Sequence, residues 1–171
     1  MRDKTRRRIR TAVVAGVVAA GGSIAVAAPA LAATTPACKA ANLTVKLGHV
    51  DAGAGQRYAT LNFKNRGKTC VLRNGLTGVT FLKSGPEGGA QKVRTTVHHA
   101  AGSGKESIVL KHGKTGHLDL HWTVVSDKPI TPDSLLFALP AHGGNTAASW
   151  RTLIGTASGK GAVLDLGHLH H

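Results

Sequence analysis

Apolar and polar residues alternate along the stretch from Tyr58 to Phe81, which reads YATLNFKNRGKTCVLRNGLTGVTF. Ala59, Leu61 and Phe63 share one parity, and polar residues stand between them. Successive side chains of a β-strand point to opposite faces, so the pattern predicts a strand with one buried side and one solvent-facing side. Tyr58 falls on the solvent-facing side.

Two turn signals divide this stretch into three predicted strands. The first is NRGK at residues 65–68, and the second is Asn74-Gly75. Cys70 and Leu72 lie between the two turns and share a face. After the second turn the alternation resumes, and Val79 and Phe81 are predicted to face inward.

The rest of the chain after residue 42 continues in shorter runs of the same kind. Further strands are predicted over residues 43–47, 93–97, 107–110, 116–125, 135–139, 150–154 and 162–166. The runs between them, including 51–55 and 141–148, are predicted to be loops. No segment here has a helical period of useful length. About nine short strands separated by turns predict an all-β, antiparallel β-sandwich.

Residues 1–32 have the pattern of a cleaved signal peptide. Met1 to Arg10 carries six basic residues and one Asp, a run rich in Ala, Val and Gly follows, and Ala30-Leu31-Ala32 is a small-residue cleavage site. The alternative is a retained anchor, because the apolar run approaches the ~20 residues that span a bilayer. If the signal is cleaved, residues 33–171 are one secreted domain with no membrane span. Sec and twin-arginine export both stay open as the route.

Charge bears on the expected partner. The chain has 22 Lys and Arg against 8 Asp and Glu, and without the signal 16 basic and 7 acidic residues leave a net charge of +9. Such a surface is attracted to anionic wall polymers or phospholipid outside the cell. The alternative is a solvated basic surface. Nucleic acid is not the expected partner, because the cations are scattered and aromatic residues for base stacking are few.

Two cysteines, Cys38 and Cys70, follow the signal. In an oxidising compartment they are expected to form one disulfide. The bond would close a loop of about 32 residues and contribute about 3–4 kcal/mol on the chain-entropy model. A thiolate metal site and two free thiols are the alternatives, although no C-x-x-C motif is present.

The motifs around Cys70 resemble those of a known family. In order they are Leu61-x-Phe63-x-Asn65-x-Gly67, Thr69-Cys70-x-Leu72 and Gly75-x-x-Gly78-Val79-x-Phe81, with a later strand ending in Trp122 and a closing Leu139-Pro140. This set is similar to the actinobacterial secreted domain of unknown function 4232. The resemblance covers nearly all of residues 33–171. It implies an immunoglobulin-like sandwich and export, and it assigns no activity.

The chain departs from the family pattern in two ways, and a separate residue, Trp122, acquires an expected role. Leu76-Thr77 stand where the family often has Tyr-Pro, and a second cysteine pair common in the family is missing. An immunoglobulin-type sandwich packs a buried tryptophan near its disulfide, so Trp122 is the candidate for that position.

No catalytic motif keeps its required context. Gly113-Lys114-Thr115 is similar to the end of a phosphate-binding loop, but Ile108 stands where that loop needs glycine, and no helix follows. There is no G-x-S-x-G, no H-E-x-x-H and no cluster of paired carboxylates. The sequence predicts a non-enzymatic protein without a cofactor, with an enzyme of unrecognised site as a rival class.

Ten histidines are the remaining chemical feature. Strand alternation places His117, Asp119 and His121 on one outer face, where they are the candidate ligands of a zinc or copper ion. A solvated sheet face is the alternative. His98-His99 and the tail of three histidines at 168, 170 and 171 are further clusters, and the tail is expected to be disordered.

These observations predict a secreted, immunoglobulin-like antiparallel β-sandwich with one disulfide. Its expected role is that of an extracellular or cell-envelope binding module, with an anionic polymer as the candidate ligand. The alternative function is extracellular binding of copper or zinc through surface histidines. The sequence names neither the ligand nor the oligomeric state.

Overall fold

The computed structural model describes residues 35–157 and 161–171, so the predicted signal peptide and its cleavage site lie outside the described residues. The described chain is built from short strands and two 3₁₀ turns. These are η1 Ala40–Asn42, β1 Leu43–Leu47, β2 Asp51–Gly53, β3 Gln56–Asn65, β4 Cys70–Arg73, β5 Thr77–Ser84, β6 Ala90–Val93, β7 Thr95–His99, η2 Ser103–Lys105, β8 Ser107–Leu110, β9 Thr115–Thr123, β10 Ser134–Leu139, β11 Gly144–Ser149, β12 Thr156–Ala157 and β13 Gly161–His170.

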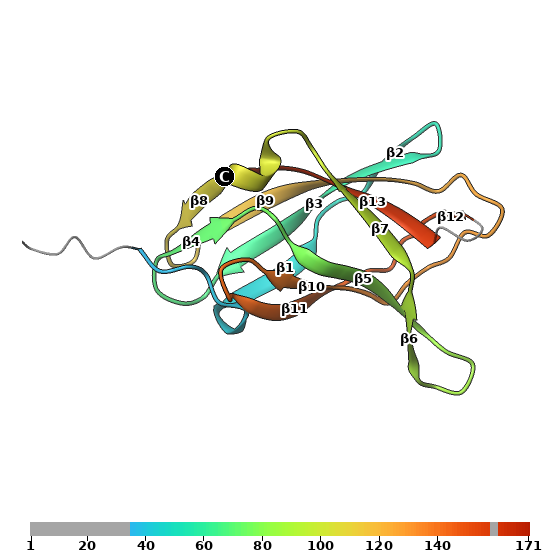
Figure 1. Ribbon diagram of the computed structural model, residues 1–171, viewed down its shortest axis with the longest axis horizontal. Helices are drawn as coiled ribbons and strands as arrows, with labels where there is room; N and C mark the ends of the chain where they lie inside the picture. Colours follow the sequence, from blue (N-terminus) through green and yellow to red (C-terminus); the bar gives the residue numbers. More distant parts are fainter. Residues whose placement is uncertain (1–34, 158–160) are drawn as a thin grey trace, which may run out of the picture. The chain divides into compact units, whose positions relative to one another are not determined.

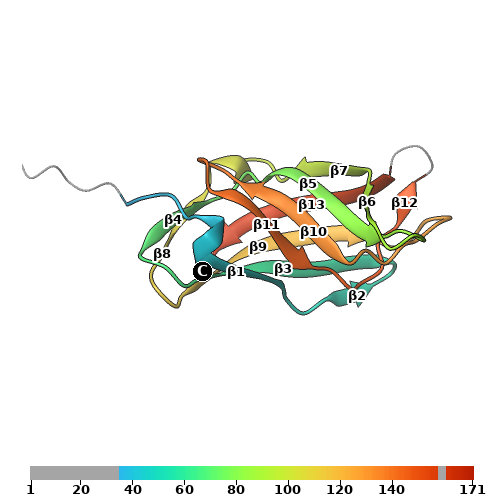
Figure 2. The ribbon, with the colours of Figure 1, turned by 90° about the horizontal axis from the view of Figure 1, so that it is seen from below.

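The strands form two main sheets and one separate pair (Figures 1 and 2). The large sheet runs β1-β3-β9-β13-β12, with β2 added to β3 and β7 added to β13. The second sheet runs β11-β10-β5-β6, and β4 pairs with β8. The all-β fold predicted from the alternating pattern is confirmed.

Aromatic side chains join the two main sheets through a common core. Phe63 of β3 meets Phe137 of β10 edge-on, with ring centroids 6.1 Å apart. Trp150 lies 4.7 Å from Trp122 of β9 and 4.8 Å from Phe81 of β5, centroid to centroid. All five rings are buried, and edge-to-face pairs of this kind add stability beyond the area that they bury.

The pairing of β3 with β9 follows the predicted parity. The strands run antiparallel from Gln56 opposite Thr123 to Lys64 opposite Thr115. Every second residue of β9 is buried, Leu118 and Trp122 among them, and the residues between are half-exposed. The inner and outer faces of this strand were therefore predicted correctly.

Trp122 is buried as predicted, but the expectation that it lies near the disulfide is wrong. The β4–β8 pair, which carries Cys70, packs at the other end of β9, where a Cβ added at Gly116 would lie 2.5 Å from Ile108 Cδ1. Six residues at about 3.3 Å each separate Gly116 from Trp122, about 20 Å along the strand. Trp122 instead packs on Trp150 and donates from Nε1 to Leu153 O at 2.9 Å.

Three of the predicted strand and loop boundaries are wrong. Residues 51–53 form β2, which pairs with β3, and residues 144–149 form β11, which pairs with β10. Both had been predicted as loops because glycine and polar residues dominate them. Residues 150–154 are not a strand; an isolated bridge joins Ile154 to Ile130 there. Tertiary pairing overrides weak β-propensity at residues 51–53 and 144–149.

The predicted strand at 93–97 is two strands that belong to different sheets. β6 pairs with β5, the strand is interrupted at Arg94, and β7 crosses to the large sheet. There β7 runs parallel to β13, with His98 opposite Asp165. This parallel pairing departs from the all-antiparallel expectation. The β13 strand continues through His170, so the expectation of a disordered histidine tail is also wrong for that residue.

The predicted disulfide between Cys38 and Cys70 is present, and the described chain has no free cysteine. Two backbone hydrogen bonds lie beside it, from Cys38 N to Val71 O at 3.0 Å and from Val71 N to Pro36 O at 2.8 Å. The bond therefore fastens the segment before β1 to β4. Sequence separation of 32 residues sets the size of the closed loop.

A buried asparagine closes the turn between β3 and β4. Asn65 has no exposed surface. Its Nδ2 donates to Lys68 O and to Leu110 O, both at 2.9 Å, and its Oδ1 accepts from Gly67 N at 2.8 Å. The sequence placed Asn65 in a turn but gave no sign that its amide joins that turn to β8.

Replacing both cysteines by alanine should lower the free energy of unfolding by about 3–4 kcal/mol, because the unfolded chain regains the entropy of an open loop. Urea titration of the non-reduced protein and of Cys38→Ala/Cys70→Ala measures the difference. Equal unfolding free energies, or two alkylatable cysteines in the untreated protein, would contradict the assignment.

Asn65→Ala should lower the free energy of unfolding by about 1–3 kcal/mol, because it leaves buried backbone groups without partners. Asn145→Ala is the matched control, since Asn145 is exposed on β11 and should change stability by less than about 0.5 kcal/mol. Urea titration again gives both values. Similar losses of unfolding free energy in the two variants would contradict the claim that the Asn65 amide stabilises the turn and its contact with β8.

Candidate functional site

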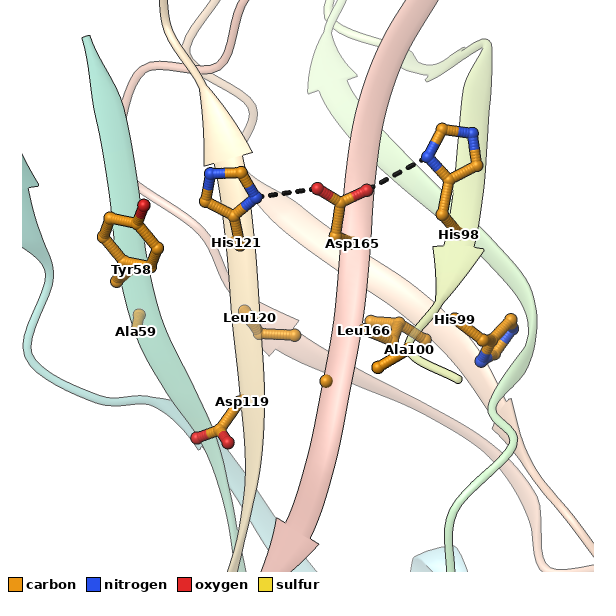
Figure 3. A pocket seen from close by; sticks show the side chains of 11 residues that line it. Tyr58, Ala59, His98, His99, Ala100, Asp119, Leu120, His121, Asp165 and Leu166 are labelled. Carbon is orange, nitrogen blue, oxygen red and sulfur yellow. Dashed lines mark hydrogen bonds and ion pairs between the residues drawn. The ribbon is translucent and has the colours of Figure 1, made fainter. Parts of the chain in front are cut away.

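One row of side chains crosses the outer face of the large sheet. Asp51 of β2 pairs with Tyr58 of β3, Tyr58 with His121 of β9, His121 with Asp165 of β13, and Asp165 with His98 of β7. We call these five residues the transverse row. Figure 3 shows four of them side by side, one from each of four neighbouring strands.

Hydrogen bonds connect the middle of the transverse row. Asp165 accepts from His121 Nδ1 at Oδ2, 2.7 Å away, and faces His98 Nδ1 from Oδ1 at 3.1 Å. The other ring nitrogen of His121 lies 2.9 Å from Gln56 Oε1. The Tyr58 ring stacks on the His121 ring with centroids 4.8 Å apart. The carboxylate therefore orients two imidazoles, and one of them supports the tyrosine.

A hollow of about 480 Å³ adjoins this row. We call it the Tyr58 hollow, and Figure 3 shows the residues around it. Its lining is Tyr58, Ala59, His98, His99, Ala100, Asp119, Leu120, His121, Asp165, Leu166 and Gly167. The volume lies within the range of small-molecule sites, about 300–1,000 Å³.

A second row lies farther along the same strands. Lys46 of β1 pairs with Asn62 of β3, Asn62 with His117 of β9, and His117 with His170 of β13. His117 Nδ1 lies 2.7 Å from Asn62 Oδ1, and the His117 and His170 rings stack at 5.5 Å. The amide oxygen of Asn62 thus makes Nδ1 the donor nitrogen of His117.

A basic groove of about 490 Å³ opens beside this second row. Its lining is Thr44, Lys46, Asn62, Lys64, Arg66, Thr115 and His117. Arg66 Nε donates to Thr44 Oγ1. The lining contains three permanent cations and one histidine and no carboxylate, so the groove has a net positive charge.

The predicted metal ligands share a face but not a site. His117, Asp119 and His121 all lie on the outer face of β9, as predicted from alternation. Their side chains reach different partners: His117 contacts Asn62, His121 contacts Asp165, and Asp119 Oδ1 faces His170 Nε2 at 3.1 Å. Within residues 35–157 and 161–171, no group of three or more His, Cys, Asp or Glu side chains is arranged to hold a metal ion. The metal hypothesis finds no support in this arrangement.

The sequence did not reveal which residues form hydrogen bonds with the histidines of the outer face. Asp165 and Gln56 lie far from His121 in sequence and meet it only through strand pairing. The groove cations Lys46 and Lys64 looked scattered for the same reason. The alternation of charged and apolar residues on β1 and β3 is visible in the sequence. The pairing of those two strands, which brings the cations together, is not.

The comparison with known families assigns the chain. Residues 38–169 match the family described as Domain of unknown function (DUF4232). The chain belongs to the DUF4232 family. No curated protein and no solved structure matches it. The immunoglobulin-like relationship therefore stays a prediction, whereas the family and the all-β fold are established. Both rows of this DUF4232 domain fall inside the matched region, except His170.

Among the described residues, no helix is long and apolar enough to cross a membrane.

A third cluster of this DUF4232 domain lies at a bulge of β13, where the register against β9 shifts between Leu166 and Leu169. Glu106 accepts from His168 Nδ1 at 2.6 Å through Oε1, and from Leu169 N at 2.8 Å and Asn74 Nδ2 at 3.2 Å through Oε2. The hydrogen bond from His168, followed by that from Leu169, lowers the pKa of Glu106 to about 2. The same hydrogen bond to Glu106 raises the pKa of His168. The cluster joins two elements by ordinary structural contacts, so we assign it a structural role.

The two pKa shifts give this cluster a pH window. The lowered pKa of Glu106 stabilises the folded state above the usual value of 4.5, and this is lost as the pH falls toward 2. The raised pKa of His168 stabilises the folded state below 6.5 and is lost as the pH rises through the folded-state value. Both contributions are present together between about pH 4.5 and 6.5.

His168→Ala should therefore lower the melting temperature more at pH 5.5 than at pH 8.5. His49→Ala is the control, because the His49 side chain is 88% exposed and its nearest carboxylate is 3.6 Å away. Thermal unfolding at both pH values compares the two variants. A loss for His168→Ala that is equal at the two pH values would contradict the coupling.

Proposed function

We propose that this DUF4232 domain is exported and acts, without catalysing a reaction, as a binding module of the cell envelope whose basic groove holds an anionic polymer. The observation that carries the proposal is the composition of the groove: Lys46, Lys64, Arg66 and His117 line it without a single carboxylate. Phosphate or carboxylate groups on a polymer would meet positive charge on each side of the groove.

Strand pairing explains why these cations act together. Lys46 lies opposite Asn62, and Lys64 lies opposite Thr44. The two lysines are diagonal neighbours on β1 and β3, about 7–8 Å apart at Cα. Hydroxyl groups of Thr44 and Thr115 stand in the same groove. Hydroxyl donors between fixed cations suit the oxygen atoms of an anionic chain.

Exposed cations give weak individual contacts, so the proposed ligand is a polymer rather than a single small anion. Lys46, Lys64 and Arg66 are exposed to solvent. Ion pairs at exposed positions contribute about 0–1 kcal/mol each. A ligand with repeated charges gains affinity by engaging several of them at once.

Two features support export. Residues 1–32 have the signal pattern described above, and the two cysteines are joined in a disulfide. Structural disulfides persist in oxidising compartments. These features also make nucleic acid a poor candidate for the groove, which contains no Phe, Tyr or Trp for stacking.

The groove variant Lys46→Gln/Lys64→Gln/Arg66→Gln should bind poly(glycerol phosphate) at least about tenfold more weakly than the unchanged protein, because three cations are lost together. The control is Lys92→Gln/Lys128→Gln/Arg73→Gln, which removes the same charges from exposed sites outside the groove. The control should keep affinity within about twofold. Isothermal titration at low salt measures both.

Salt and pH provide a second test of the mechanism. Binding should weaken steeply between about 0.1 M and 1 M salt, where the Debye length falls from ~10 Å to ~3 Å. It should strengthen at pH 5.5, where histidine side chains gain charge. Equal losses of affinity in the groove and control variants would mean that overall charge alone drives binding. That result would overturn the groove as the binding site.

A further inference from the structure

The Tyr58 hollow differs in charge from the rest of the domain. Its lining contains Asp119 and Asp165 and neither Lys nor Arg, although the chain as a whole has a large positive charge. We propose that this hollow is a second binding site, and that it takes an alkylated ammonium group such as the trimethylammonium of a choline-like ligand. The site is separate from the basic groove and has the opposite charge preference.

The first argument is the exposure of Tyr58. The chain has six aromatic residues in all, and five of them, Phe63, Phe81, Phe137, Trp122 and Trp150, are buried. Tyr58 is 52% exposed and lines the hollow. Aromatic rings attract cations, and quaternary ammonium groups are the ligands that use this attraction most often.

The second argument is that the tyrosine is held in place. Its ring stacks on His121, with 27° between the planes. Gln56 and Asp165 hold the two nitrogens of His121 at 2.9 and 2.7 Å. A ring that is already oriented loses little freedom on binding a ligand, and this raises affinity.

The third argument concerns the carboxylates of the hollow. Asp119 and Asp165 supply negative charge inside it, and Asp51 stands opposite Tyr58 on the neighbouring strand. A positive group within the hollow is therefore attracted from more than one side.

The contacts of the carboxylates favour an alkylated ammonium over a bare one. Both oxygens of Asp165 already face histidine nitrogens, and Oδ1 of Asp119 faces His170. A bare ammonium needs acceptors for three N–H groups. A trimethylammonium group needs charge and carbon contacts without hydrogen bonds, and Ala100 and Gly167 offer small, apolar surface.

The glycine of the β13 bulge keeps the hollow open. A Cβ at Gly167 would lie 2.8 Å from the Cβ of Asp119, which is too close for any larger residue without displacing the aspartate. The small residue therefore leaves Asp119 in the lining. Ala100, directly after β7, is held by a hydrogen bond from its N to Leu166 O at 2.9 Å.

The experiment is an NMR titration of the purified protein with choline and with its uncharged isostere 3,3-dimethylbutan-1-ol, following the ring resonances of Tyr58 and His121. Choline should bind at least about tenfold more tightly than the isostere at pH 7.5. Tyr58→Ala should weaken choline binding about fivefold, and Tyr58→Phe, which keeps the ring, should restore it.

Carboxylate variants complete the test. Asp119→Asn should weaken choline binding about fivefold, whereas Glu87→Gln, which removes an acid from the β5–β6 turn, should leave it unchanged. The Asp119 carboxylate faces His170, whereas His98 and His121 pair with Asp165, so this variant keeps the Asp165 pairs. Equal binding of choline and its isostere, shifts confined to other residues, or binding of N-acetylglucosamine in preference to choline would overturn the proposal.

Discussion

The antiparallel pairing of β3 with β9 is the constraint on which the rest of the structure depends. It runs from Gln56 opposite Thr123 to Lys64 opposite Thr115. Because side chains alternate with a period of two, this one register places Phe63 and Trp122 in the core and Tyr58 and His121 on the outer face. A slip of one residue would exchange the two sets, and both the aromatic core and the polar rows would be lost together.

The same register places two hollows with oppositely charged linings on a single sheet face. The transverse row brings Asp165 beside His121, and the row farther along the strands brings Lys46 and His117 to either side of Asn62. Acidic and basic groups are therefore separated along the strands rather than mixed. A ligand that carries both phosphate and alkylated ammonium groups would meet complementary charge at each end of this face, and steering by such patches favours one orientation over the reverse.

The predictability of each feature from sequence depends on how local its cause is. Alternation at 59–63 and 116–122 identified inner and outer faces correctly, because parity is a local property. The disulfide followed from compartment and cysteine count. The strand at 144–149 was missed because glycine and polar residues form it and only pairing with β10 makes it a strand. The partners of His121 were hidden for the same reason: Asp165 lies 44 residues away, and strand order brings them together.

The central claim is that the outer face of the β1–β3–β9 region is the binding surface. Mapping amide shifts of ¹⁵N-labelled protein during titration with poly(glycerol phosphate) tests it most directly. The account predicts shifts that follow the groove on β1, β3 and the start of β9, around Lys46, Asn62 and His117. Shifts concentrated on the other sheet, along β5, β6, β10 and β11, or spread evenly over all exposed cations, would contradict it.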